Sequence, residues 1–167
     1  IKEVSGIPIH EYVKVNFNAV TEIIDALGGV EFDVPQNMNY EDPYQDLYIH
    51  LSKGKQVLNG EQSLQLLRFR NYPMGDLQRI EVQQSFMSEL SKQKAKLKYI
   101  SKASKIYNAV NDNITTSLSK SEIVSLAKSI RKGEMVTHNF PTYISPSGTY
   151  VLVNKEEASK FVDTYFK

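Results

Sequence analysis

Stretches with the apolar spacing of helices alternate along this chain with shorter stretches that have the spacing of strands. Apolar side chains recur at helix spacing from Phe17 to Leu27, and Gly28-Gly29 then ends the predicted helix. The next segment, Val30 to Val34, alternates apolar with acidic residues, which is typical of a half-buried strand. Elements that alternate in this way pack in layers, so we expect an α/β fold: a layered α-β-α domain with a central mixed sheet flanked by helices.

The remaining elements are predicted from the same spacing and from helix-capping pairs. Capping pairs three residues apart predict helix starts at Asn59–Gln62, Ser119–Glu122 and Asn154–Glu157. A long helix is expected from Asp76 to about Leu97. The other predicted segments are strands over 10–15, 47–51 and 150–153, an irregular polar loop over 36–46, and a helix from Ile100 to Val110.

Length and composition exclude several classes of function. The 167 residues fit one domain, residues 1–167, and 20 basic against 19 acidic side chains give no global attraction to nucleic acid. The absence of cysteine excludes thiol nucleophiles and thiolate metal sites. No apolar run approaches the roughly 18 residues that a membrane span needs. Because the chain begins at Ile1 rather than Met and the predicted sheet is thin, we expect a longer parent whose upstream segment supplies further strands.

The first two turns of the helix predicted from Asp76 are unusually polar on their inward side. At about 100° per residue, Asp76, Arg79 and Gln83 fall on the same stripe as the apolar side chains of later turns. An inward stripe is normally apolar throughout, so these residues predict a polar pocket at the start of the helix. The amino end of a helix favours anions, and an arginine there adds paired donors suited to phosphate.

Arg68 and Arg70 lie just before this helix, and their spacing leaves two interpretations open. On a helix they would point apart, whereas in extended chain they would point the same way. Either the preceding helix ends near Arg68 and both arginines converge on the pocket, or one of them is structural. Asp76 could also serve only as a helix cap, or only as a surface ion pair with Arg79.

Four ordered motifs together resemble the LytR-CpsA-Psr family. They are the strand-like run Ile7–Asn16, the leucine-glycine-glycine-valine run within Ile24–Pro35, the segment Gly54–Arg70 that ends in Arg-x-Arg, and the pattern Asp76-x-x-Arg79-x-x-x-Gln83. The match covers roughly residues 1 to 100 and implies a layered α/β domain that lacks its N-terminal part. It departs from the family at Val82, a position that is often arginine.

The resemblance implies a phosphotransferase that attaches polyprenyl-pyrophosphate-linked anionic glycopolymers, of teichoic acid or capsule type, to peptidoglycan. Carried over by motif, Arg68, Arg70 and Arg79 would bind pyrophosphate, Gln83 would hydrogen-bond a phosphate oxygen, and Asp76 would orient Arg79 or act as a base. Catalysis of this kind works by positioning and charge neutralisation. The implied cofactor is Mg2+, with ligands mostly in the upstream part and none among these five residues.

The resemblance also implies an extracytoplasmic protein, anchored to the membrane through an upstream segment and without a nucleic-acid partner. Two alternatives stay open: a transcriptional attenuator or regulatory module, and a non-catalytic lipid-binding module. The three histidines, His10, His50 and His138, share no metal-ligand spacing and are expected to have structural or surface roles. Some apolar side chains are candidates for either core packing or the lining of a lipid tunnel: Ile24, Leu64, Leu67, Phe86 and Leu90.

Overall fold

The computed structural model describes residues 6–96, 99, 103–130, 136–148 and 150–166 and divides the chain into two compact units. The larger unit is Val13–Val136, and the smaller consists of Ile1–Tyr12 together with Thr137–Lys167. The prediction of a single domain over residues 1–167 stays a prediction. Leu97 and Ile100, named above as helix positions, lie outside the described residues.

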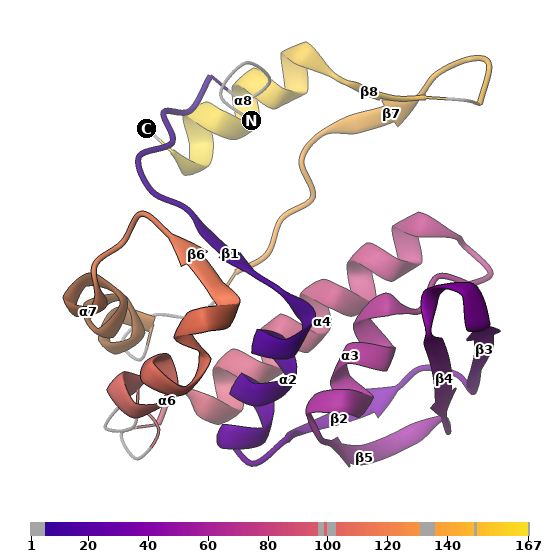
Figure 1. The fold of residues 1–167 in the computed structure, drawn as a ribbon. Helices are drawn as coiled ribbons and strands as arrows, with labels where there is room; N and C mark the ends of the chain where they lie inside the picture. The colour runs from indigo at the N-terminus through magenta and orange to yellow at the C-terminus, as the bar shows by residue number, and fades with distance from the viewer. Residues whose placement is uncertain (1–5, 97–98, 100–102, 131–135, 149, 167) are drawn as a thin grey trace. The chain divides into compact units, whose positions relative to one another are not determined.

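The larger unit combines helices and strands, which confirms the predicted α/β class. Its helices are α2 (Phe17–Ala26), α3 (Gly60–Arg68), α4 (Asp76–Lys94), α6 (Ala103–Val110) and α7 (Lys120–Ile130). Its strands are β1 (Val13–Val15), β2 (Val30–Val34), β3 (Met38–Asp42), β4 (Leu47–Leu51), β5 (Gly54–Leu58) and β6 (Ile114–Thr116), with 3-10 turns at Pro43–Gln45 and Asn111–Asn113. Helix α3 contacts both α2 and β4 and lies between them (Figure 1).

Every sheet in the described residues has two strands, and the two strands are antiparallel. In the larger unit β1 pairs with β6, β2 with β5, and β3 with β4. Where we predicted one central mixed sheet, these residues therefore form separate ribbons. Short connections explain why the β2–β5 and β3–β4 ribbons are antiparallel. A 3-10 turn links β3 to β4, and the hairpin that these two strands form is itself the connection between β2 and β5. Parallel pairing would need a long crossover between strands.

The predicted loop over residues 36–46 is wrong, because half of it is strand β3. Met38 is fully buried, and its strand gains a complete ladder with β4 that outweighs the polar composition of the segment. The turn that follows is held by Asp42, whose carboxylate accepts from the Tyr44 N–H at 3.1 Å. The strand predicted from His10 is shorter than expected and covers only β1.

The helix starts that were predicted from capping pairs are confirmed. The Asn59 side chain accepts from the Gln62 N–H at 2.8 Å while the Gln62 side chain accepts from the Asn59 N–H at 3.1 Å. Ser119 and Glu122 make the same reciprocal pair ahead of α7. Asn154 accepts from the backbone N–H three residues later. Each pair supplies partners for backbone groups that a helix end leaves unsatisfied.

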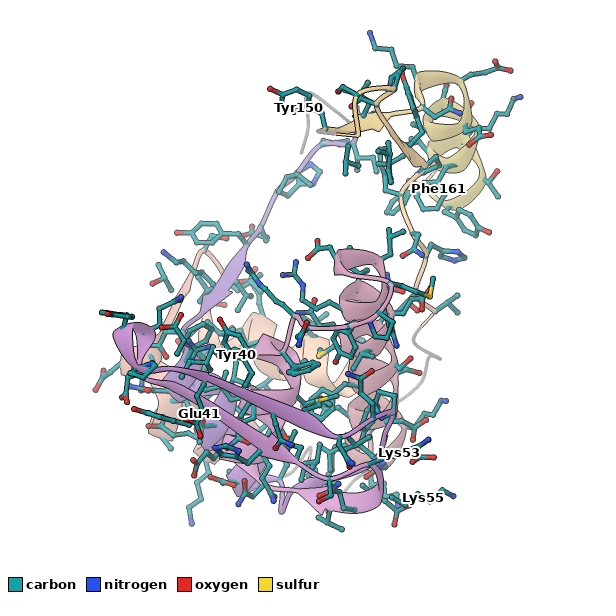
Figure 2. The ribbon with its side chains drawn as sticks, turned by 90° about the vertical axis from the view of Figure 1, so that its right-hand side faces the viewer. Tyr40, Glu41, Lys53, Lys55, Tyr150 and Phe161 are labelled. Atoms are coloured by element: carbon teal, nitrogen blue, oxygen red, sulfur yellow. The ribbon has the colours of Figure 1, made fainter. Side chains whose placement is uncertain are left out.

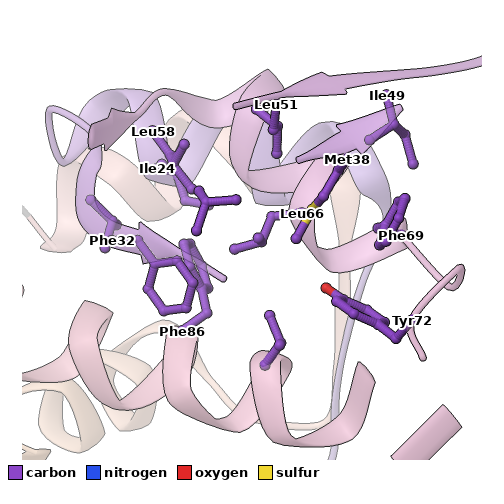
Figure 3. Packing of buried hydrophobic residues seen from close by; sticks show 13 residues of the cluster. Ile24, Phe32, Met38, Ile49, Leu51, Leu58, Leu66, Phe69, Tyr72 and Phe86 are labelled. Carbon is purple, nitrogen blue, oxygen red and sulfur yellow. The ribbon is translucent and has the colours of Figure 1, made fainter. Parts of the chain in front are cut away.

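The hydrophobic core of the larger unit lies between the two ribbons of residues 30–58, α3 and α4 (Figure 3). Strand β2 alternates as predicted, with its apolar side chains buried and its acidic side chains exposed. Phe86 of α4 meets Phe32 of β2 edge to face, with ring centroids 5.6 Å apart. Phe86 and Ile24, two candidates for a lipid-tunnel lining, are buried members of this core.

The smaller unit consists of a hairpin and one helix: β7 (Thr142–Ile144), β8 (Val151–Val153) and α8 (Lys155–Tyr165). His138 packs against the aromatic side chains of α8, with its ring centroid 4.1 Å from that of Tyr165 and 5.8 Å from that of Phe161. This histidine therefore has a packing role, as expected. In the described part of the chain, no helix is both long and apolar enough to span a membrane.

Candidate functional site

Helix α3 ends at Arg68, which decides between the two interpretations of the arginine pair. Phe69 leaves the helix in an extended conformation, with φ −64° and ψ 134°, and its side chain is buried in the core. Residues on either side of an extended position share a side of the chain. Arg68 and Arg70 accordingly line the same cavity.

Helix α4 begins at Asp76, as predicted, but Asp76 does not cap it. Gly75 occupies the capping position with φ 62°, a conformation that favours glycine, and no side chain caps the helix. Asp76 is the first helical residue rather than the cap. Its carboxylate instead pairs with the guanidinium of Arg79, Oδ1 to Nη2 at 2.8 Å. Asp76 is thus placed to orient Arg79 from the first turn of α4.

The cavity, named here the arginine cavity, has a volume of about 770 Å³. The side chains that line it are Phe17, Tyr40, Gln45, Leu47, Leu67, Arg68, Arg70, Asn71, Arg79 and Gln83. Three of these are arginines and none is a carboxylate, so the described lining has an excess of positive charge. The Arg68 guanidinium lies 4.7 Å from the centroid of the Phe17 ring, a cation–π contact that helps to fix its position. The arrangement is suited to an anion.

Arg79 has the most constrained environment of the three arginines. Its side chain is only 19% exposed, and its Nε is buried without a hydrogen-bond partner in the described residues. A buried donor left without a partner costs about 1–3 kcal/mol. Arg79 is thus a cavity-lining cation that, within the described residues, has one buried donor without a partner.

Gln83 has a structural partner within the chain. Its Nε2 donates to the Leu67 carbonyl oxygen at 2.9 Å and so ties α4 to the last turn of α3. The bond leaves the Gln83 amide oxygen and one amide hydrogen for a ligand. The structure therefore brings Arg68, Arg70, Arg79 and Gln83 together at one cavity, while their individual roles stay predictions.

A second cavity, of about 310 Å³, also borders these two helices and is named here the apolar cavity. Helix α2 contributes Phe17 to the arginine cavity and Ile23 to the apolar one. Helix α4 contributes Arg79 and Gln83 to the first, then Met87 and Leu90 to the second. The polar-then-apolar stripe predicted for α4 thus corresponds to two adjoining kinds of lining. Of the tunnel candidates, Leu67 lines the arginine cavity and Leu90 the apolar one.

The described residues supply no cluster of carboxylates for a magnesium ion. Mg2+ is bound by oxygen ligands, chiefly carboxylates. Within the described ranges no group of three or more histidine, aspartate or glutamate side chains could hold a metal ion, and the arginine cavity has no lining carboxylate.

Sequence reasoning missed five residues of the cavity: Phe17, Tyr40, Gln45, Leu47 and Asn71. Phe17 was assigned to an inward helix stripe, and Tyr40 and Gln45 to a solvated loop. No spacing signal marks them, because strand β3 and its turn reach the cavity only through tertiary packing. Val82, by contrast, is buried in the core, so this position does not supply a ligand to the arginine cavity.

Tyr72, in the connection between α3 and α4, gives a prediction for the pH dependence of stability. Its side chain is 6% exposed, its hydroxyl has no partner in the described residues and turns toward the core (Figure 3), and burial raises its pKa from 10.0 to about 12. Between these values the unfolded chain loses the proton and the folded chain keeps it, so stability falls as pH rises. Across this pH range the free energy of unfolding of the wild-type protein, measured with urea, should fall by on the order of 2 kcal/mol because of Tyr72, and Tyr72→Phe should remove this fall.

The exposed Tyr44 provides the control for this measurement. Tyr44→Phe removes a tyrosine hydroxyl that is already in solvent, so its stability should follow that of the wild-type protein at every pH. If the curves for Tyr72→Phe and the wild type stayed parallel through the alkaline range, the buried, protonated state assigned to Tyr72 would be wrong.

The chain matches the LytR_cpsA_psr family over residues 1–167. It is 33% identical to polyisoprenyl-teichoic acid–peptidoglycan teichoic acid transferase TagU of Enterococcus faecalis, over 75% of this chain and 40% of that protein. It is 31% identical to biofilm regulatory protein A of Streptococcus mutans, over 96% of this chain and 41% of that protein.

A solved structure supports the fold. The crystal structure of TagV from B. subtilis matches with a TM-score of 0.71 at 26% identity, over 98% of this chain and 66% of that chain. The present chain spans only about 40% of the length of the two relatives named above. With the family match extending over residues 1–167, the chain belongs to the LytR-CpsA-Psr family.

Proposed function

We propose that the parent protein is a phosphotransferase that attaches polyprenyl-pyrophosphate-linked anionic glycopolymers, of teichoic acid or capsule type, to peptidoglycan. The observation that carries this proposal is the arginine cavity, where three arginines meet and Arg79 has a buried donor without a partner. The name of the enterococcal relative, a teichoic acid transferase that acts with peptidoglycan, supports the same reading.

The two cavities are suited to the two ends of a prenyl pyrophosphate. Arg68, Arg70 and Arg79 supply charge-assisted hydrogen bonds to the phosphate oxygens. The apolar cavity, bordered by Met87 and Leu90 further along α4, offers a surface that excludes water from a hydrocarbon tail. Because both cavities border α2 and α4, one amphipathic ligand can bind along this helix pair.

The proposed reaction is an attack by a peptidoglycan hydroxyl on the phosphorus that bears the glycopolymer. A new phosphorus–oxygen bond forms to the acceptor, the bond to the lipid-borne phosphate breaks, and prenyl phosphate leaves. Arg68, Arg70 and Arg79 offset the negative charge on the phosphates throughout. Asp76 holds Arg79 in place. A role for Asp76 as the base that accepts the acceptor's proton stays a prediction, because its carboxylate does not line the cavity. A requirement for Mg2+, with ligands from outside this chain, stays a prediction.

The setting of this reaction is also part of the proposal. A peptidoglycan acceptor and a lipid-carried donor meet outside the cytoplasm at the membrane surface. We therefore propose an extracytoplasmic protein held at the membrane by a segment outside this chain, with the glycolipid and peptidoglycan as its partners and no nucleic-acid partner.

Transfer of labelled lipid-linked polymer to purified peptidoglycan by the full-length protein tests this proposal. Arg70→Ala should lower the transfer rate by about 100-fold, because it removes a donor that stabilises phosphate charge. Lys92→Ala, which removes an exposed cation ion-paired at 3.0 Å to Glu89 on α4, should leave the rate unchanged. If transfer is equal in all three proteins, the arginine cavity is not the site of this reaction.

The regulatory alternative predicts a different result. A gel-shift series over increasing salt would show sequence-selective DNA binding that persists at high salt if the protein were a transcriptional attenuator. The proposed enzyme should show at most weak binding that is lost as salt rises. The lipid-binding alternative predicts prenyl pyrophosphate binding without any transfer.

A further inference from the structure

The lining of the arginine cavity includes a second set of side chains with a different chemistry. Besides the arginines it contains the aromatic rings of Phe17 and Tyr40 and the amides of Gln45 and Asn71. The volume of about 770 Å³ is in the range of about 300–1,000 Å³ that is usual for sites that hold drug-sized molecules. The cavity therefore offers more room and more varied contacts than a pyrophosphate group alone requires.

Tyr40 reaches the cavity because of its register on β3. Consecutive strand residues point to opposite faces, so Tyr40 shares a face with Met38 and with its partner Ile49, both of which are fully buried. Tyr40 continues this inward face to the cavity, with its side chain 42% exposed, while Glu41 lies on the other side of the ribbon (Figure 2). An aromatic ring is thus held at the cavity by a rigid, paired strand.

The two amides line the same cavity as this ring and the arginines. The Gln45 Nε2 donates to the Asp42 carboxylate at 2.6 Å, which fixes the amide and leaves its oxygen as an acceptor. Asn71 directly follows Arg70 in the chain, and its amide has both donor and acceptor atoms. Arginine side chains only donate, so these amides and the tyrosine ring are suited to an uncharged ring that has hydroxyl groups and an apolar C–H face.

The geometry points to a sugar subsite: Tyr40, with Gln45 and Asn71, binds the first sugar of a glycosyl pyrophosphate whose phosphates are held by Arg68, Arg70 and Arg79. This inference rests on the proposed function and adds to it the residues that select the sugar. Tyr40 supplies the stacking surface, and the amides bind the hydroxyl groups. With this subsite, the enzyme binds the lipid donor that still has its sugar more tightly than it binds the prenyl phosphate that is released as product.

Binding of two matched probes to the full-length protein tests the subsite. One probe is a short-chain prenyl pyrophosphate, and the other is the same compound with one N-acetylhexosamine on its terminal phosphate. Tyr40→Leu should weaken binding of the sugar-bearing probe by about fivefold to tenfold and leave binding of the sugar-free probe unchanged. Tyr40→Phe keeps the ring and should retain most of the affinity for both probes.

Tyr48 gives a matched control on the same ribbon. It pairs with Glu41 across β3 and β4, so it lies on the face opposite Tyr40, and its exposure of 47% is similar. Tyr48→Leu should leave the affinity for both probes unchanged. Since the two substitutions are chemically identical and both sit on this ribbon, a general disturbance of the ribbon would appear in both.

The outcomes separate the subsite from the proposed function. If Tyr40→Leu weakened the binding of both probes equally, or of neither, the sugar subsite would be overturned. The proposed binding of pyrophosphate would not be affected by either result. Tighter, Tyr40-dependent binding of ADP than of the sugar-bearing probe would assign the ring to a nucleobase instead. A wild-type protein that binds neither prenyl probe would contradict the proposed function and the subsite together.

Discussion

Arg79→Ala in the full-length protein is expected to weaken prenyl pyrophosphate binding by about 10- to 100-fold. The substitution removes charge-assisted hydrogen bonds, each worth about 1.5–3 kcal/mol, from a side chain that is four-fifths buried at the cavity. Arg79→Lys should fall between the wild type and the alanine variant, because lysine keeps the charge but loses the planar set of donors. Isothermal titration calorimetry with the sugar-free probe measures both.

Lys92→Ala is the matched control for this substitution. Lys92 lies on the same helix and makes the same i,i+3 type of ion pair, but its side chain is 59% exposed and it lines neither cavity. Its replacement should leave the dissociation constant unchanged. If the Arg79→Ala variant bound the probe as tightly as the Lys92→Ala variant does, Arg79 would not be a pyrophosphate ligand.

Gly60→Ala is expected to destabilise the protein by about 3 kcal/mol. A Cβ atom at Gly60 would overlap the Thr21 carbonyl oxygen of α2 and lie 2.7 Å from the Thr21 Cα, so the two helices would have to move apart. They are also joined by the Gly60 N–H, which donates to the Asp25 carboxylate at 2.7 Å. Urea unfolding should show a lower transition midpoint for the variant.

Ser63→Ala is the control that shows whether the loss of stability in Gly60→Ala comes from the close approach of α2 and α3. Ser63 is buried on the same helix, and its hydroxyl has no hydrogen-bond partner in the described residues. Removing that hydroxyl should leave stability unchanged or slightly raised, since no bond is lost. An unchanged midpoint for Gly60→Ala would mean that α2 and α3 pack less closely than the structure shows. Because α2 carries Phe17 and α3 carries Arg68, their spacing also determines the shape of the arginine cavity.

The arginine side of the cavity could be predicted from sequence because it depends on local geometry. The placement of Arg79 and Gln83 on one stripe follows from helical periodicity alone. The convergence of Arg68 and Arg70 needed one further fact, that α3 ends at Arg68, and the sequence left this open. Of the alternatives left open for Asp76, the capping role is excluded, because Gly75 occupies the capping position, and the ion pair with Arg79 is present.

The aromatic and amide side could not be predicted, because it depends on contacts between distant segments. Tyr40 reaches the cavity only once β3 pairs with β4 and Met38 is buried, and the polar sequence around it gave no strand signal. Likewise, the antiparallel ribbons depend on which strands pair, which periodicity does not determine. The sequence therefore predicted the fold class and the grouping of Arg79 and Gln83 at one end of α4, but not the residues proposed to bind the sugar.

A crystal structure of the full-length protein with a short-chain prenyl pyrophosphate tests the central proposal most directly. The expected result is phosphate oxygens within hydrogen-bonding distance of Arg79 Nε and of the guanidinium groups of Arg68 and Arg70, with the prenyl chain directed toward Met87 and Leu90. Pyrophosphate bound elsewhere, with Arg79 Nε still without a partner, would contradict it.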